Sequence, residues 1–75
     1  MATAFVLINV EIGSEDEVLR GLKPISEVKE AHLVYGVYDI IVRIETETMQ
    51  ELKDAVSWKI RRVDKVRSTL TMIVI

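Results

Sequence analysis

A short segment of the chain carries the residue types that bind small charged molecules. It is the run Tyr35-Gly36-Val37-Tyr38-Asp39, and an apolar stretch flanks it on each side. A glycine in a tight turn permits a positive φ and close approach of a ligand, and the amides of such a turn can converge on an anion. The Asp39 carboxylate can pair with an ammonium group or hydrogen-bond local amides. The segment is therefore a candidate ligand site, and turn chemistry is the alternative interpretation.

The other ionisable residues have simpler explanations. His32 is the only histidine and falls on an expected strand without a nucleophile or base beside it, so we expect no catalytic residue. The acids 15–17 suit the positive end of a helix dipole. The absence of cysteine excludes a thiolate metal site, and a single histidine disfavours a His-rich zinc or haem site, so we expect no metal and no cofactor. A basic cluster near a helix C-terminus is interpreted as a solvated face: Lys59, Arg61, Arg62, Lys65 and Arg67.

Length and charge limit the classes of function. The chain has 75 residues, 49% of them hydrophobic, and a net charge of −2. We expect one domain over residues 1–75, with a core too small for strong stability on its own, so self-association is expected. Negative charge disfavours direct nucleic-acid binding. The longest apolar run, residues 4–8, cannot span a bilayer, and we expect a cytoplasmic protein with no membrane partner.

The first half of the chain predicts a strand, a helix and a second strand. Apolar residues alternate from Ala4 to Ile12 and predict a strand that ends at Gly13. Ser14 and Glu17 have the spacing of a capping box, which opens a helix that Pro24 ends. A strand over 28–35 follows.

The second half repeats this order. A strand over 38–45 follows Gly36 so closely that we expect a tight antiparallel hairpin. Thr48 and Glu51 form a second expected capping box. The helix that it opens has an apolar stripe, and a last strand covers 66–75; the stripe is Met49, Leu52, Val56 and Ile60. The order β-α-β-β-α-β predicts an α+β, ferredoxin-like βαββαβ sandwich, with two helices on one face of a four-stranded antiparallel sheet.

Alternation along the strands predicts which residues face the helices. We expect these to be Ala4, Val6, Ile8, Val10, Ile40, Val42, Ile44, Leu70, Met72 and Val74. The opposite face then holds Phe5, Leu7, Ile41, Ile73 and Ile75, together with the polar Asp39, Arg43, Thr69 and Thr71. Such an apolar face indicates sheet-to-sheet dimerisation, a dimeric α+β barrel. Trp58 lies off the helix stripe and is expected to point outward, as a second contact or folded over its own helix.

The chain resembles the effector-binding domain of the Lrp/AsnC feast/famine regulators, also called the RAM domain. The resemblance rests on segments 4–10, 25–28, 34–42 and 66–74, and above all on Gly36-Val37-Tyr38-Asp39 and Thr69-Leu70-Thr71. Those regulators carry an N-terminal helix-turn-helix domain, for which this sequence has no residues. It is therefore similar to stand-alone members of the family.

The resemblance implies a function and a site. It implies dimers in a ring, commonly an octamer, with free amino acids bound between dimers, and a module that co-assembles with full-length regulators. The implied ligand-binding residues are Tyr35, Gly36, Val37, Tyr38, Asp39, Thr69 and Thr71. The second helix has no fixed motif from which to match residues, and Lys53 or Asp54 there would favour different ligand side chains.

Three alternatives differ from this interpretation, and the first of them is disfavoured. Amino-acid sensors of the ACT type share the element order, but they bind at a first strand-helix turn with a Pro-Gly pair, and this turn is Ile12-Gly13-Ser14. A small dimeric α+β-barrel enzyme, a monooxygenase or isomerase, would need titratable groups in its pocket, and this sequence offers little beyond His32. The third is a structural oligomer whose ligand site is vestigial.

Overall fold

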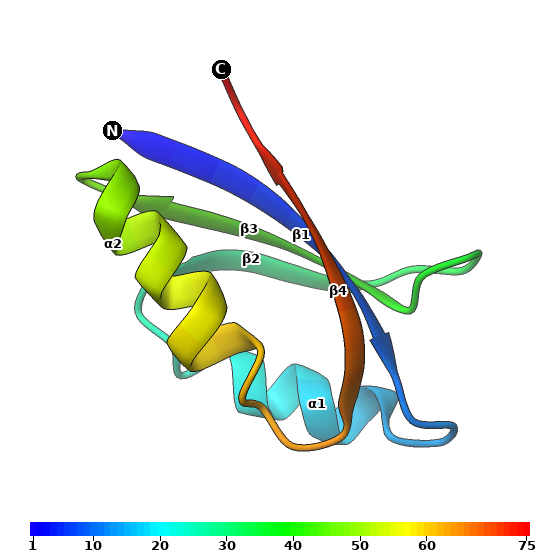
Figure 1. Cartoon of the computed structure of the whole chain (residues 1–75). Coiled ribbons are helices and arrows are strands. Elements are labelled where there is room, and N and C mark those ends of the chain that lie inside the picture. Colours follow the sequence, from blue (N-terminus) through cyan, green and yellow to red (C-terminus); the bar gives the residue numbers. More distant parts are fainter.

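The computed structural model describes residues 1–75, which form one antiparallel sheet with the helices on one of its faces (Figure 1). The strands lie in the order β2-β3-β1-β4, and every neighbouring pair is antiparallel. The ferredoxin-like prediction is therefore confirmed. The elements are β1 (Ala2–Val10), α1 (Glu15–Leu22), β2 (Val28–Leu33), β3 (Ile40–Thr46), α2 (Met49–Asp54), the π-helical η1 (Ala55–Ile60), which continues α2, and β4 (Val66–Ile73).

Strand β1 lies at the centre and alternates between buried and half-buried residues, as its sequence predicts. The prediction that Ile12 continues the buried face is wrong, since Ile12 is 98% exposed. The strand ends at Val10, and the amide of Glu11 donates instead to the carbonyl of Lys65, at 3.0 Å. Gly13, at φ +82°, then turns the chain toward α1.

Helix α1 begins after Ser14, as expected, but the Ser14–Glu17 capping box is wrong. The Ser14 side chain makes no capping hydrogen bond. The Glu17 carboxylate instead accepts a hydrogen bond from Lys65 Nζ at 2.9 Å, so it is engaged by the turn before β4. The helix ends at Leu22, two residues before Pro24, which agrees with the expected stop.

The capping box of the second helix is confirmed. Thr48 Oγ1 accepts from the Glu51 amide at 3.1 Å, and Glu51 Oε1 accepts from the Thr48 amide at 3.2 Å. Each residue thus satisfies an amide that a helix start leaves without an intrahelical partner.

The apolar stripe of the second helix is only partly as predicted. Leu52 and Ile60 are buried, but Met49 is 42% exposed and Val56 is half-buried, while Ala55 takes a buried position. Met49 is the first residue of α2, and Ala55, three residues after Leu52, shares its buried side by ordinary helical spacing. The helix then widens into η1, where the Arg61 amide donates to the Val56 carbonyl five residues back, and Ile60 is buried five residues after Ala55.

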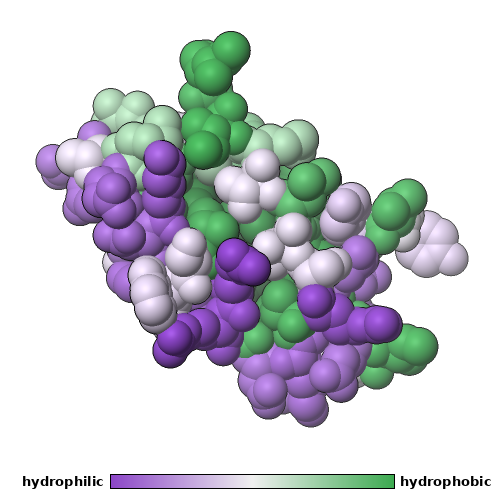
Figure 2. All heavy atoms as spheres, viewed as in Figure 1, coloured by the Kyte–Doolittle hydropathy of each residue, from purple (hydrophilic) through white to green (hydrophobic).

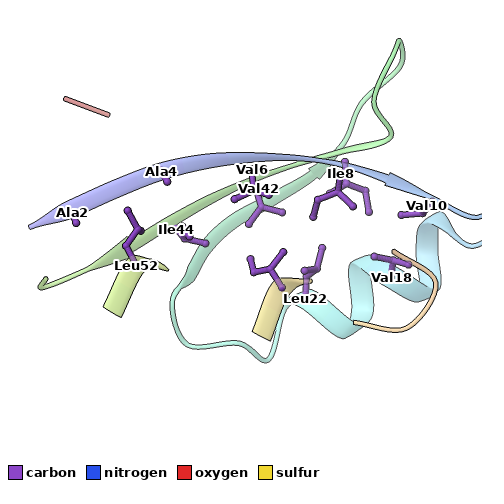
Figure 3. Packing of buried hydrophobic residues seen from close by; sticks show 12 residues of the cluster. Ala2, Ala4, Val6, Ile8, Val10, Val18, Leu22, Val42, Ile44 and Leu52 are labelled. Atoms are coloured by element: carbon purple, nitrogen blue, oxygen red, sulfur yellow. The ribbon is translucent and has the colours of Figure 1, made fainter. Parts of the chain in front are cut away.

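The core fills the layer between the sheet and the helices (Figure 3). Side chains of β1 and β3 point toward Val18 and Leu22 of α1 and Leu52 of α2. Burial of each Val, Leu or Ile side chain contributes about 1.5–3 kcal/mol. The twelve core residues are Ala2, Ala4, Val6, Ile8, Val10, Val18, Leu22, Ile40, Val42, Ile44, Leu52 and Ile60.

The surface on the helix side is mainly hydrophilic over α1 and α2, and hydrophobic atoms gather at the projecting C-terminal end (Figure 2). Trp58 points outward as predicted, being 61% exposed, and the Arg62 guanidinium stacks on its ring with Cζ 4.6 Å from the centroid. None of the helices is long and apolar enough to cross a membrane.

Candidate functional site

The segment 34–39 forms a loop that projects beyond the end of the sheet (Figure 1). The predicted antiparallel hairpin of β2 and β3 is confirmed, but its turn is longer than expected, because β2 ends at Leu33 and β3 begins at Ile40. The Val34 amide donates to the Asp39 carbonyl at 2.9 Å and closes the base of the loop. The tip therefore extends into solvent.

Gly36 occupies the tip with a backbone that only glycine adopts readily, at φ +155°. A Cβ built on this residue has no atom within 4 Å. Its neighbours Tyr35 and Val37 are exposed, and Tyr35 is exposed over its whole side chain. The loop tip thus has open space around it, and no other part of this protomer covers it.

Asp39 has a structural partner that its sequence position does not reveal. Its Oδ2 accepts a hydrogen bond from the Val10 amide at 3.0 Å, while its own amide donates to the Ile8 carbonyl at 2.9 Å. The side chain therefore extends the β1–β3 ladder beyond Ile8↔Ile40, the last backbone pair. The carboxylate also borders a cleft of about 430 Å³ at the end of β1, and its second oxygen has no hydrogen-bond partner within the protomer.

Thr69 and Thr71 lie on the opposite face of the sheet from the one predicted. Thr69 pairs with Ile8 and Thr71 with Val6, so both share the helix-facing side of β1. Leu70, opposite Leu7, and Met72, opposite Phe5, occupy the open face instead. Directly opposed residues of antiparallel strands point to the same side. The assignment of β4 was therefore wrong by one residue of phase, which moves every side chain of the strand to the other face.

A groove of about 190 Å³ lies between the second helix and β4. Its apolar lining comes from Leu52, Val56 and Ile73, and Lys53 adds one cation. Ser57 and Thr71 add two hydroxyls, and the lining contains no acidic side chain. The groove can therefore bind an apolar group beside a carboxylate. Ser57 and Val56 were not foreseen, because no motif in the sequence marks them.

The seven predicted ligand-binding residues do not meet in one protomer. Tyr35, Gly36, Val37, Tyr38 and Asp39 belong to the projecting loop, whereas Thr71 lines the groove and Thr69 lines a separate hollow with Arg61 and Arg67.

The open face of the sheet carries an apolar centre and a charged edge. Its centre comprises Phe5, Leu7, Ile41, Leu70 and Met72, while Ile73, which was expected there, lines the helix-side groove. Toward the β2 edge, Arg43 of the inner strand β3, opposite Phe5, has its Nε 2.7 Å from Glu30 Oε2 and also pairs with Glu45. The Arg43 hydrogen bond, followed by that of His32, lowers the pKa of Glu30. The exposed His32 has no other side-chain partner.

Comparison with known proteins identifies the family. The sequence model described as "Lrp/AsnC ligand binding domain" matches residues 3–75. The regulatory protein AsnC of Haemophilus influenzae is 34% identical over 58 residues, which cover 77% of this chain and 39% of that protein. The HTH-type transcriptional regulator FL11 of Pyrococcus furiosus is 35% identical over 72 residues, which cover 96% of this chain and 47% of that protein. This chain spans less than half the length of these curated relatives.

Solved structures agree with the sequence comparisons. The crystal structure of FFRP-DM1 is 45% identical, with a TM-score of 0.95 and full coverage of both chains. Escherichia coli AsnC is 27% identical with a TM-score of 0.92, covering 99% of this chain and 50% of its own. A feast or famine regulatory protein of M. tuberculosis, solved with L-methionine, is 26% identical with a TM-score of 0.82. The match covers 100% of this chain and 50% of that one. The chain described here therefore belongs to the Lrp/AsnC ligand-binding domain family.

Proposed function

We propose that this chain is a non-catalytic amino-acid-sensing and oligomerisation module that modulates amino-acid-responsive transcription regulators by co-assembly. The observation that carries the sensing role is the groove beside β4, with its apolar floor, one cation and two hydroxyls. Its volume of about 190 Å³ is below the ~300–1,000 Å³ of pockets for drug-sized ligands, so a small metabolite fits best. A free amino acid, such as the L-methionine of the M. tuberculosis relative, has this size and chemistry.

The groove of one protomer supplies only part of such a site. Lys53 offers a charge to the α-carboxylate, but no lining residue offers one to the α-ammonium group. The projecting loop carries the Asp39 carboxylate, with one oxygen free, and Gly36 with open space around it. We propose that the loop of a second copy covers the groove, so that the amino acid binds between dimers of the assembly. This arrangement explains why the predicted residues are apart within one protomer.

Assembly begins, in this proposal, at the open face of the sheet. Five apolar side chains form its centre and none is covered by the helices, which is uncommon for a monomer. Two such faces packed together give the dimeric α+β barrel, and dimers then associate into a ring, with an octamer as the expected state. The charged edge around Arg43 and Glu30 would lie at the rim of this interface.

An enzymatic role has less support. The groove contains no histidine, cysteine or acidic residue, so its lining offers no acid–base pair. Lys53 is its only ionisable side chain. His32, the residue that an enzyme of this fold would have to use, is exposed on the edge strand β2, and its only polar side-chain partner is Glu30.

A thermal-shift screen of the twenty amino acids at millimolar concentration tests the sensing role. A ligand at a hundredfold excess over its Kd stabilises the native state by about 2.7 kcal/mol, which a melting curve detects readily. Lys53→Gln and Gly36→Val should each remove the shift, since they change the groove and the loop. Lys23→Gln, which removes a charge at the end of α1, is the matched control. Absence of a shift with every amino acid would contradict the proposal.

A further inference from the structure

A hollow of about 330 Å³ beside the start of β4 has a lining unlike that of the groove. Its lining combines two arginines, Arg61 and Arg67, with Thr69, whose side chain shares the helix-facing side of the sheet with Ile8; Ser68 borders it from β4, and Val66 is its only apolar residue. No acidic side chain lines it. We name this site the arginine hollow, and we propose that it binds a phosphate group, either as free phosphate or as part of a phosphorylated metabolite.

The position of Arg67 results from a β-bulge. Asn9 pairs with Ser68 and the next residue, Val10, pairs with Val66, which leaves Arg67 as the extra residue of β4. Bulges interrupt the ladder and redirect a side chain, and they are frequent beside functional sites. Regular pairing would have given Arg67 a partner on β1. The irregularity instead places its side chain in the hollow beside Arg61, which follows η1 directly.

Neither guanidinium has a carboxylate partner within 4.0 Å, although the chain has twelve acidic residues. Arg61 gains from the negative end of the helix dipole, but that explanation does not extend to Arg67, which lies on a strand. Arg67 also borders the cleft that contains Asp39 and forms no ion pair with it. Two unpaired positive charges in one hollow favour a doubly charged ligand over a single carboxylate.

The Thr69 hydroxyl complements the guanidinium groups. It makes no side-chain hydrogen bond within the protomer and is free to donate, whereas Ser68 pairs with Asn9 on the other face of the sheet and accepts from its Nδ2 at 3.4 Å. A phosphate accepts several hydrogen bonds at once, and an arginine fork matches its oxygens in a bidentate manner. The two arginines and the Thr69 hydroxyl can therefore donate to the phosphate oxygens, which are mainly acceptors.

Isothermal titration calorimetry of the full chain at fixed ionic strength tests this site. We expect saturable binding of inorganic phosphate, one per chain, and a parallel titration with glycerol 3-phosphate shows whether the free ion or a phosphomonoester binds more tightly. Arg67→Gln and Arg61→Gln should each raise Kd at least about tenfold, because each removes a charged fork. Arg67→Lys keeps the charge but loses the fork, and should weaken binding less than Arg67→Gln.

Arg62→Gln is the matched control, since it removes the same charge from a side chain that stacks on Trp58 and does not line the hollow. It should change Kd by less than about twofold. If Arg62→Gln raised Kd as much as Arg61→Gln, phosphate would be attracted by the overall positive charge of this surface and not by a defined site, and the proposal would be overturned. The absence of saturable binding to both probes would overturn it as well. Thr71→Val, in the groove, should leave phosphate binding unchanged, so failure of the amino-acid site and failure of the arginine hollow are separately observable.

Discussion

Replacement of Asp39 separates its structural role from its proposed role in ligand binding. In the folded chain Asp39 Oδ2 accepts from the amide of Val10, a residue that is only 5% exposed. Asp39→Ala leaves this buried amide without a partner, which costs about 1–3 kcal/mol. For a domain of this size about 1 kcal/mol corresponds to roughly 4–8 °C in Tm, so we expect a fall of about 4–24 °C.

Asp39→Asn provides the matched comparison, because its amide oxygen can still accept from Val10. A hydrogen bond to a charged group contributes about 1.5–3 kcal/mol and a neutral one about 0.5–1.5, so the loss should be about 1 kcal/mol. Asp39→Asn should therefore melt between the parent and Asp39→Ala. It should also bind the amino acid found in the screen more weakly, since it lacks the charge that pairs with an ammonium group.

Thermal unfolding followed by circular dichroism at one protein concentration measures these differences, and the concentration is fixed because an oligomer's Tm depends on it. Calorimetric titration measures ligand affinity in the same samples. If Asp39→Ala melts with the parent, the hydrogen bond to Val10 contributes nothing and the structural argument is refuted. If Asp39→Asn binds the amino acid as tightly as the parent, the carboxylate has no role in recognition.

Three further changes test other parts of the molecule. Leu70→Lys places a charge on the open face and should reduce the oligomer's mass in light scattering; an unchanged mass would contradict dimerisation through that face. Thr48→Ala removes the cap of α2 and should destabilise the fold by about 1 kcal/mol in urea unfolding. The hydrogen bond from Lys59 lowers the pKa of Glu27 below 4.5, so its stabilising effect is present above that pH and lost as the pH falls through the folded-state pKa. Glu27→Gln should thus be less stable than the parent at pH 6, by at most about 1 kcal/mol, and this difference should shrink as the pH falls through the folded-state pKa of Glu27.

The sequence alone indicated most of the fold because its local signals agree with one another. Alternation identified the buried faces of β1 and β3, and Thr48 and Glu51 identified the start of α2. The Ser14–Glu17 pair shows the limit of such signals. Its spacing was correct, but Lys65, distant in the sequence, binds the Glu17 carboxylate in the folded chain. A capping motif predicts a helix start more reliably than it predicts the hydrogen bonds made there.

The candidate site was less accessible to sequence reasoning. The loop residues could be singled out, because a glycine and an aspartate between two apolar strands suit either a turn or a ligand site. Lys53 could be named only as one possibility beside Asp54, and Val56 and Ser57 not at all, because the groove exists only where the second helix packs beside β4. The π-helical η1 added to the difficulty, since its buried residues Ala55 and Ile60 are five residues apart, and the helical spacing of three or four residues does not predict this.

The amino-acid sequence by itself determined the order of the elements, the buried face of the central strands and the family to which the chain is similar. Only the tertiary structure decided which way β4 faces. Either phase of its alternation contains apolar residues, and the pairing of Leu70 with Leu7 placed the more apolar phase on the open face. The bulge at Arg67 likewise follows from pairing with β1. Both depend on contacts between residues far apart in the chain, and a one-residue change of register reverses the faces of a strand.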